Sequence, residues 1–376
     1  MPRKPASPAP TEHTEPVVSL RDLEFEARKH LEPAVYDFVA GGAEDEVTIR
    51  ANDSAFLRIN LVPRVLCGRG TPNLAVDLLG QPATMPVLIA PTAFHRLAHP
   101  DGECATARAA AAAGVIMIAS MASTVAIEEI AAAASEQTAG TPPNIWLQLY
   151  IQPDLGFTEA IIRRAETAGC NTLVVSVDSP ILGHRERDER NGFHTLPSGL
   201  CCEIMRGRNV DGIESQPRDM VFSPDFSWQH IEWLRKTTEL RIVLKGVMHP
   251  ADARLAVEAG VDALIVSNHG GRQLDTVPAT IELLPAIRDV VAGRLPLLLD
   301  GGIRRGTDIV KALALGATAV AIGRPVLWGL AVAGQQGVTR VLEMLRSELV
   351  RALTLCGCGS PNDVSPDLLR LQREEK

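Results

Sequence analysis

A histidine and an arginine, His269 and Arg272, stand three residues apart directly after a short apolar run rich in β-branched residues, Ala263–Val266. The run predicts a buried parallel strand. A histidine side chain can accept a proton near neutral pH, and an arginine can bind a carboxylate through two hydrogen bonds. The two glycines between them allow a tight turn close to a ligand. The pattern indicates acid–base chemistry on a carboxylic acid.

Further ionisable residues follow other apolar runs. Asp178, Lys245 and Asp300 each stand at or just after the end of a predicted strand. The alternative for His269 is a polar turn with a solvated histidine. That alternative does not explain why three further ionisable residues also stand at the ends of predicted strands. We therefore favour an active site assembled from the ends of several strands.

Eight apolar runs alternate with alanine-rich or amphipathic helical segments, several of which end at a glycine, as helices commonly do. The predicted strands begin at Val87, Val115, Ile145, Thr172, Ile242, Ala263, Leu295 and Ala319, and the predicted helices span 105–113, 127–134, 158–168, 251–259, 281–291 and 308–315. Repeated strand–helix units predict an α/β fold, a (β/α)8 TIM barrel with its active site at the carboxyl ends of the strands. A doubly wound sheet is the alternative, but no Gly-x-Gly-x-x-Gly follows the first strand.

Two loops near the end of the chain combine glycine with arginine, namely Gly301-Gly302 with Arg304 and Gly323 with Arg324. Glycine permits a close approach to backbone N–H groups, and arginine adds positive charge. The loops after the last two strands of a TIM barrel often bind phosphate. We therefore predict a phosphate site, with two ordinary turns and surface arginines as the alternative.

The segments outside the repeating units also have recognisable patterns. Residues 1–18 hold five prolines and little apolar content, so we expect a disordered tail. One helix should open at Ser19, with Asp22 placed for a capping box, and a second should cover Pro33–Ala40. The long, weakly patterned interval 187–225 after the fourth barrel strand is typical of a mobile lid. We expect residues 19–376 to form a single barrel domain.

Composition excludes several functional classes. The 376 residues carry a net charge of −8 without a basic run, which argues against a nucleic-acid partner. No apolar run is long enough to span a membrane, and no secretory signal opens the chain. The seven cysteines lack the spacing of a disulfide framework or a zinc site. We expect no bound metal, no membrane association, reduced thiols and a cytoplasmic location.

The segment Ser-Asn-His-Gly-Gly-Arg-Gln at 267–273 resembles the signature of the FMN-dependent 2-hydroxy acid oxidases and dehydrogenases. The segment Tyr-Asp-Phe-Val-Ala-Gly-Gly-Ala-Glu-Asp at 36–45 looks like the N-terminal motif of the same family. The resemblance runs from about Leu20 to about Asp367. It implies FMN as the cofactor and oxidation of an (S)-2-hydroxy acid, a small molecule, to the 2-keto acid.

The resemblance also assigns a cofactor site. It implies that the predicted phosphate site holds the phosphate of FMN, that Asp300 contacts the ribityl chain and that Lys245 lies at the N1–C2 carbonyl edge of the flavin. Other residues should surround the ring: the main chain of Pro91, Thr92 and Ala93 beside N5, the side chains of Ser120, Gln148 and Ser176 as hydrogen-bond partners, and Ser267 of the signature.

At the substrate end, Arg185 and Arg272 would bind the carboxylate and place the α-carbon over N5. Tyr150 resembles the tyrosine that contacts the substrate in the family. His269 would be the general base, and Asp178 would stabilise its imidazolium form.

Two positions depart from glycolate oxidase: Phe38 aligns with a tyrosine, and Ala122 aligns with a tryptophan of the pocket wall. The loss of a hydroxyl and an indole predicts a larger, more apolar pocket and a substrate with a bulky aryl or extended alkyl side chain. Ala93 resembles the oxidases, so we expect molecular oxygen as the acceptor, hydrogen peroxide as a product and, by family resemblance, a homotetramer. A dehydrogenase that uses a quinone or a protein acceptor and a non-oxidising FMN-barrel isomerase are the alternatives.

Overall fold

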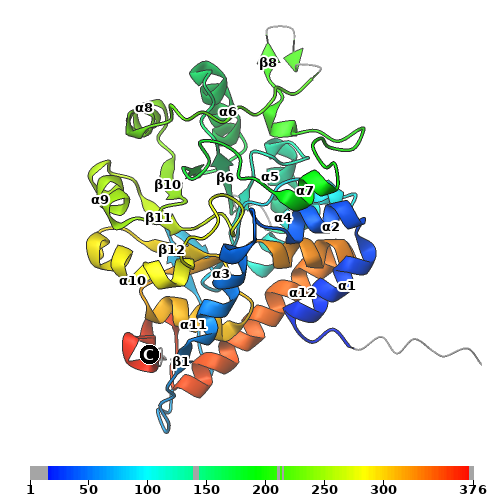
Figure 1. The fold of residues 1–376 in the computed structure, drawn as a ribbon. Helices are drawn as coiled ribbons and strands as arrows, with labels where there is room; N and C mark the ends of the chain where they lie inside the picture. The colour runs from blue at the N-terminus through cyan, green and yellow to red at the C-terminus, as the bar shows by residue number, and fades with distance from the viewer. Residues whose placement is uncertain (1–15, 139–143, 210–211, 214–215, 372–376) are drawn as a thin grey trace, which may run out of the picture.

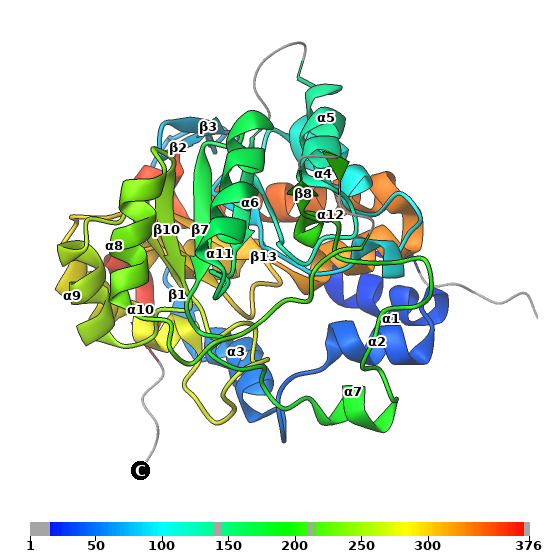
Figure 2. The same cartoon turned by 90° about the horizontal axis from the view of Figure 1, so that it is seen from above.

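The computed structural model describes residues 16–138, 144–209, 212–213 and 216–371. Its centre is a closed barrel of eight parallel strands with helices around it (Figure 1, Figure 2). The barrel is completed where the last strand, β13, pairs with the first, β4. The strands in barrel order are β4 (Val87–Ile89), β5 (Met117–Ala119), β6 (Ile145–Leu149), β7 (Thr172–Ser176), β10 (Arg241–Lys245), β11 (Ala263–Val266), β12 (Leu297–Asp300) and β13 (Ala319–Ile322). The predicted (β/α)8 barrel is confirmed.

Each barrel strand is followed by helical structure on the outside of the barrel. The helices are α4 (Gly102–Ala113), α5 (Ile127–Ser135), α6 (Leu155–Thr167), α8 (Trp228–Thr237), α9 (Pro250–Glu258), α10 (Thr280–Val291), α11 (Gly306–Ala314) and α12 (Arg324–Cys356). All six helices predicted between strands are present, with shifted ends.

Two predicted strand starts are wrong by two residues. Val115 does not open β5, because its N–H still bonds to the carbonyl of Ala110 in the preceding helix at 3.0 Å. Leu295 does not open β12, because Pro296 has no N–H to donate to a neighbouring strand. In addition, β10 begins one residue before the predicted Ile242.

Alternate strand residues face two different apolar cores, as expected from the two-residue period of a strand. Leu88 and Trp146 belong to the core inside the barrel, whereas Val87 and Ile89 pack with the surrounding helices. The antiparallel hairpin of β2 (Val76–Leu78) and β3 (Gln81–Ala83) contributes to the inner core, and its Gln81 accepts a hydrogen bond from the indole of Trp146.

The N-terminal segment forms three helices before the barrel. The two predicted ones are present as α1 (Leu20–His30) and α2 (Pro33–Ala40), and the Ser19 hydroxyl accepts a hydrogen bond from the N–H of Asp22 at 3.2 Å. The third, α3 (Val47–Leu57), was not predicted. Its first N–H groups, on Val47 and Thr48, donate to the carboxylate of Asp275 at 3.0 and 2.7 Å.

The C-terminal helix α12 is bent, with non-helical backbone angles at Ala333 and Gly334. Its two halves meet so closely that a β-carbon on Gly337 would lie 1.8 Å from the carbonyl oxygen of Gly329. After it the chain returns, and β14 (Leu369–Leu371) pairs antiparallel with β1 (Ile59–Leu61). Three of the short 3-10 helices in the described residues lie outside the long segment after β7: η1 (His95–Leu97), η3 (Pro361–Asp363) and η4 (Pro366–Leu368).

The long segment after β7 holds α7 (Glu186–Arg190), η2 (Glu203–Met205), β8 (Arg208–Asn209) and β9 (Gly212–Ile213). Figure 2 shows α7 beside α2. Arg187 joins the two, because its guanidinium lies 3.4 Å from Asp37 and 2.5 Å from Glu46. That this segment is a mobile lid remains a prediction.

Of the predicted disordered tail, residues 1–15 lie outside the described residues. The same holds for residues 210–211 and 214–215 of the predicted lid. No helix in the described ranges is long and apolar enough to cross a membrane.

Candidate active site

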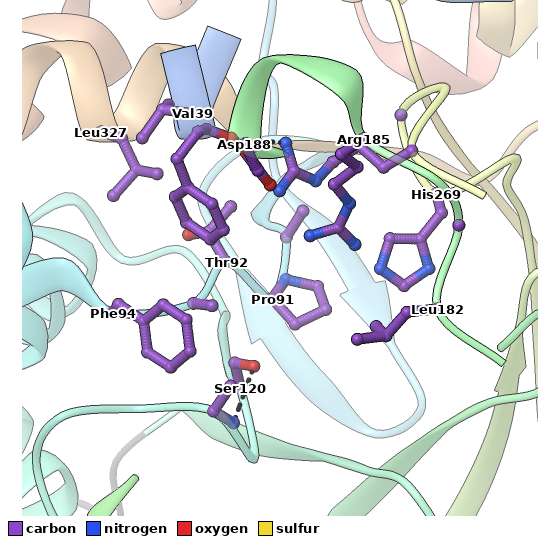
Figure 3. Close-up of a pocket in the computed structure, with 18 of the residues that line it drawn as sticks. Val39, Pro91, Thr92, Phe94, Ser120, Leu182, Arg185, Asp188, His269 and Leu327 are labelled. Atoms are coloured by element: carbon purple, nitrogen blue, oxygen red, sulfur yellow. Dashed lines mark hydrogen bonds between the residues drawn. The ribbon is translucent and has the colours of Figure 1, made fainter. Parts of the chain in front are cut away.

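A cavity of about 920 Å³ opens at the carboxyl ends of the barrel strands (Figure 3). Most of the predicted site residues line it: Phe38, Pro91, Thr92, Ala93, Ser120, Ala122, Tyr150, Arg185, Lys245, His269, Arg272, Asp300, Gly301, Gly302, Arg304, Gly323 and Arg324. The others lie behind the wall and contact or pair with lining residues: Gln148, Ser176, Asp178 and Ser267. The barrel therefore gathers at one end residues that are dispersed along the sequence.

His269 and Asp178 form a hydrogen-bonded pair, with 2.9 Å between Nδ1 and Oδ1. Burial lowers the pKa of His269 below its ordinary value, although Asp178 opposes the shift. Burial favours the neutral form of Asp178, but the attraction of His269 and Lys245 outweighs it and holds the pKa of Asp178 below its usual value. The imidazole is therefore neutral, with its Nδ1 proton donated to Asp178 and Nε2 free to accept a proton.

The backbone around His269 is left-handed over three residues, with φ angles of 58° at His269, 65° at Gly270 and 74° at Gly271. The two glycines adopt this conformation without strain, whereas a residue with a β-carbon loses about 1–2 kcal/mol. The N–H of His269 donates to the hydroxyl of Ser267 at 3.1 Å, which helps to hold the turn.

A pair of asparagines connects the same turn to α3. The side chains of Asn268 and Asn52 exchange two hydrogen bonds of 2.8 and 2.9 Å, both buried. The N–H of Gly271 also donates to the carbonyl of Asn268 at 3.0 Å. The unpredicted helix α3 is therefore part of the support of the His269 turn.

Lys245 is a buried cation with two partners at the bottom of the cavity. Its ammonium group lies 3.3 Å from the carboxylate of Asp300 and donates to the hydroxyl of Ser267 at 3.0 Å. Burial disfavours the charged form of Lys245, but Asp300 and Asp178 outweigh this effect and raise its pKa. Lys245 therefore stays protonated, as one half of an ion pair with Asp300.

Five buried side-chain polar atoms have no partner within the described residues, and two of them belong to predicted cofactor contacts: Nε2 of Gln148 and Oδ1 of Asp300. The amide orientation of Gln148 is fixed by its oxygen, which accepts hydrogen bonds from the hydroxyl of Ser120 and the N–H of Met121 at 3.1 and 3.2 Å. A buried polar group without a partner is unfavourable, so both atoms indicate a ligand that accepts from one and donates to the other.

The two glycine–arginine loops lie together, as expected for a phosphate site. Gly302 has φ of 80°, and a β-carbon there would lie 2.2 Å from the carbonyl oxygen of Asn52. Arg304 approaches Asp53 at 3.6 Å. The guanidinium of Arg324 donates to the carbonyls of Val39 and Gly41 at 3.0 and 2.8 Å. Burial lowers the pKa of Arg324 to about 10.

Two further arginines face the cavity near His269. Arg272 donates through Nη1 to the carbonyls of Phe38 and Gly41 at 2.6 and 3.0 Å, and its guanidinium carbon lies 4.9 Å from the centroid of the Phe38 ring. Arg185 has a buried Nε without a partner. Burial lowers the pKa of both, and neither forms an ion pair within the described ranges. Two adjacent unpaired guanidinium groups indicate an anion site.

The remaining wall is apolar and aromatic. The ring of Phe38 lies 5.7 Å from that of Phe94 and 5.0 Å from that of Phe193, and Tyr150 contacts Phe222 edge-on at 5.1 Å. Ala122 is buried in this wall. The hydroxyl of Tyr150 lies 3.5 Å from Nε2 of His269, so it faces the same space as the candidate base.

The sequence analysis missed Gln273, although it belongs to the 267–273 segment. Its side-chain amide donates to the carbonyls of Asp178 and Ile181 at 3.0 and 2.9 Å and accepts from the N–H of Gly183 at 3.0 Å. Gln273 therefore joins the loop that carries Asp178 to the turn that carries His269.

Asp188 was also missed, and it lines the cavity near Arg185 (Figure 3). A signal was present, because Asp188 follows Arg185 by three positions, about one helical turn. In the described part of the chain, no group of three or more histidines, cysteines, aspartates or glutamates could hold a metal ion.

Known proteins are similar to this chain over most of its length. A family model described as FMN-dependent dehydrogenase matches residues 27–371. An L-lactate oxidase of Nostoc sp. strain PCC 7120 is 46% identical over 362 residues, which cover 94% of this chain and 98% of that protein. The peroxisomal (S)-2-hydroxyacid oxidase GLO3 of Arabidopsis thaliana is 44% identical, covering 95% and 98%. A crystal structure of mandelate oxidase with (S)-2-phenylpropionate superposes with a TM-score of 0.85 at 42% identity, covering 94% and 98%.

Proposed function

Because this chain belongs to the family of FMN-dependent dehydrogenases, we propose that it oxidises an (S)-2-hydroxy acid with a bulky apolar side chain, aryl or extended alkyl, and passes the electrons to molecular oxygen. The relatives establish the coarser class, FMN-dependent oxidation of a 2-hydroxy acid. The observation that carries the proposal is the placement of the neutral His269 beside two unpaired arginines and an aromatic wall.

The residues of the cavity fit FMN. The unpartnered Nε2 of Gln148 and Oδ1 of Asp300 offer one donor and one acceptor to a polar ring system and its ribityl chain. The phosphate would be held by the backbone of Gly301, Gly302 and Gly323 with Arg304 and Arg324. Lys245, Ser120, Ser176, Ser267 and the main chain of Pro91, Thr92 and Ala93 would complete the site around the ring. Bound FMN supplies the acceptor for two electrons.

The chain itself binds, orients and deprotonates the substrate. Arg185 and Arg272 hold the carboxylate, and Tyr150 contacts the same molecule from beside His269. Nε2 of His269 removes a proton from the substrate, and the carboxylate of Asp178 stabilises the imidazolium that forms. The apolar wall at Phe38 and Ala122 receives the side chain of the substrate and excludes water.

The overall reaction balances as R–CH(OH)–COO⁻ plus O2 giving R–CO–COO⁻ plus H2O2. The substrate loses two protons and two electrons, and oxygen gains them. The alternative acceptors are a quinone and a protein, either of which would take the same two electrons.

The test uses the purified yellow holoenzyme and a panel of substrates: glycolate, L-lactate, (S)-2-hydroxyhexanoate and (S)-mandelate. Without air, bleaching of the flavin absorbance by these acids supports oxidation, and persistent colour with all of them would favour a non-oxidising isomerase. With air, stoichiometric hydrogen peroxide supports the oxidase. Bleaching followed by slow reoxidation in air and rapid reoxidation by a quinone would instead identify a dehydrogenase.

We propose in addition that the protein is a cytoplasmic homotetramer. All seven cysteines lie in the described part of the chain and none forms a disulfide, which suits a reducing compartment. The tetramer rests on family resemblance. Light scattering of the holoenzyme and cell fractionation test the two statements separately, and a monomeric mass or a peroxisomal location would refute one of them.

A further inference from the structure

The carboxylate of Asp188 lies in the same cavity as the two arginines that face His269. Asp188 stands on α7, three residues after Arg185, and both line the cavity with Arg272 (Figure 3). Within the described residues, no hydrogen bond reaches the Asp188 side chain and no cation lies within 4.0 Å of it. The carboxylate is therefore near the arginines but does not occupy the position of an ion-paired partner.

The position of Asp188 is fixed by its neighbours on α7 rather than by its own side chain. Arg187 joins the helix to Asp37 and Glu46, and the amide of Asn191 donates to Asp37 at 2.9 Å. The carbonyl of Asp188 accepts a hydrogen bond from the N–H of Phe193 at 2.8 Å. The contacts of α7 therefore fix the position of the Asp188 carboxylate beside Arg185 and Arg272.

Asp188 and the arginines influence one another electrostatically. Burial raises the pKa of Asp188, and the attraction of Arg272 and Arg185 opposes that rise. In turn, Asp188 counteracts the lowering of the pKa of both arginines. The three side chains therefore act as one charged group, with two positive charges and one negative charge.

The net charge of these three side chains is balanced by a single carboxylate. Two guanidinium charges and one aspartate leave one net positive charge, which a monocarboxylate neutralises. A second carboxylate on the substrate would find no counter-charge left in this group, and against the aromatic wall it would be an unpaired ion, which is strongly disfavoured.

We infer that Asp188 is a specificity-determining residue that restricts the site to monoanionic 2-hydroxy acids and rejects 2-hydroxy dicarboxylic acids. The inference rests on the proposed function, because it concerns the substrate class of the same site. It also implies that Asp188 limits how tightly a 2-keto acid product is retained by the two arginines.

The experiment compares the holoenzyme with Asp188→Asn at pH 8, where a carboxyl group is ionised. The ratio of kcat/KM for (S)-2-hydroxyglutarate to that for (S)-2-hydroxyhexanoate should rise by about ten-fold in Asp188→Asn, because the substitution removes the repulsion between Asp188 and the second carboxylate of the substrate. Asp188→Glu keeps the charge and should retain the wild-type ratio. The matched control is Glu186→Gln on the same helix, whose partner is the exposed Arg190, and it should leave the ratio unchanged.

A second readout does not require turnover. The dissociation constants of hexanoate and glutarate are measured from the change that each causes in the absorbance of the bound flavin. Asp188→Asn should lower the dissociation constant of glutarate more than that of hexanoate. If the asparagine variant does not fold, Asp188→Ser replaces it in the same measurement.

The outcomes separate the two claims. If the wild type oxidises 2-hydroxyhexanoate but Asp188→Asn leaves both ratios unchanged, the role of Asp188 is refuted and the proposed function stands. If the wild type oxidises none of the acids, the proposed function fails, and the binding titration alone decides whether Asp188 discriminates by charge.

Discussion

Nδ1 of His269 and Oδ1 of Asp178 lie 2.9 Å apart, although 91 positions of sequence separate the two residues. Gln273 strengthens the relationship, because its amide bonds the carbonyl of Asp178 from the same turn that carries His269. The aspartate is charged and the imidazole neutral, which leaves Nε2 as the proton acceptor.

The acid limb of the pH profile should have an unusually low midpoint. Protonation of His269 removes the base, so kcat/KM falls as the pH drops through its pKa in the free enzyme. Since burial lowers that pKa, the midpoint should lie below 6.5, the ordinary value of histidine. Asp178 raises the pKa of His269, so Asp178→Asn should move the midpoint further down while reducing the maximal rate. A midpoint above 6.5, or an upward shift in the variant, contradicts the assignment.

His269→Ala should retain the flavin and lower the rate of flavin reduction by roughly two to four decades, the range for a general base. The flavin should remain because the glycine–arginine loops do not depend on the imidazole. Stopped-flow absorbance measures the rate, and His30→Ala on the surface of α1 is the control. A rate near that of the wild type would remove His269 from the mechanism.

Arg272→Lys should lower kcat/KM, although the substitution conserves the positive charge. The guanidinium donates to two carbonyls, packs on the ring of Phe38 and must still bind a carboxylate, which a single ammonium group cannot do together. The loss of one charged hydrogen bond, about 1.5–3 kcal/mol, predicts a fall in kcat/KM of roughly ten-fold to more than hundred-fold. Arg190→Lys, at an exposed position of α7, should show no fall.

Ala122→Trp should shift substrate preference from large to small side chains. Ala122 is buried in the aromatic wall, and an indole there would occupy the space proposed for an aryl or alkyl group. A hydrophobic pocket discriminates by roughly 1–3 kcal/mol per methylene, so the ratio of kcat/KM for (S)-mandelate over glycolate should fall by orders of magnitude. If the wild type already prefers glycolate, or if the ranking does not change, Ala122 does not set the size of the pocket.

Gln273→Ala should weaken the hydrogen-bonded contact between the loop that carries Asp178 and the turn that carries His269. The variant loses hydrogen bonds to Asp178, Ile181 and Gly183, each typically worth about 1 kcal/mol. We expect a lower melting temperature and a lower kcat with little change in KM. Gln229→Ala, an exposed glutamine on α8, is the control, and equal effects in both variants would refute the positioning role.

Local patterns in the sequence were sufficient for the repeating part of the fold. The strand at Ala263–Val266 was predicted with its correct ends because an apolar β-branched run and a following glycine pair define it within a few residues. The start of α1 was likewise visible, since Ser19 and Asp22 form the cap within one turn. Cavity residues that stand at strand ends, such as Lys245 and Asp300, could be predicted from the same local pattern, whereas Phe38 on α2 and Arg185 beyond β7 were predicted only through the family resemblance.

Features that depend on distant partners could not be predicted. The helix α3 begins where Asp275 bonds the N–H groups of Val47 and Thr48, from 228 and 227 positions away, and no nearby residue supplies a cap. The anchoring of Arg324 to the carbonyls of Val39 and Gly41 is of the same kind. The role of Gln273 was hidden for the opposite reason, because its partners are main-chain atoms that carry no signature of side-chain type.

The pairing of β13 with β4 has a consequence for biosynthesis. Val320 pairs with Val87, and the cavity draws Ala90 to Ala93 from one of these strands and Gly323 with Arg324 from the other. A nascent chain emerging from the ribosome therefore exposes two open sheet edges until its last barrel strand is free, and such edges invite aggregation. Loading of the cofactor must wait until almost the whole chain has been synthesised, so a premature stop before β13 yields a product that can neither close nor retain a flavin.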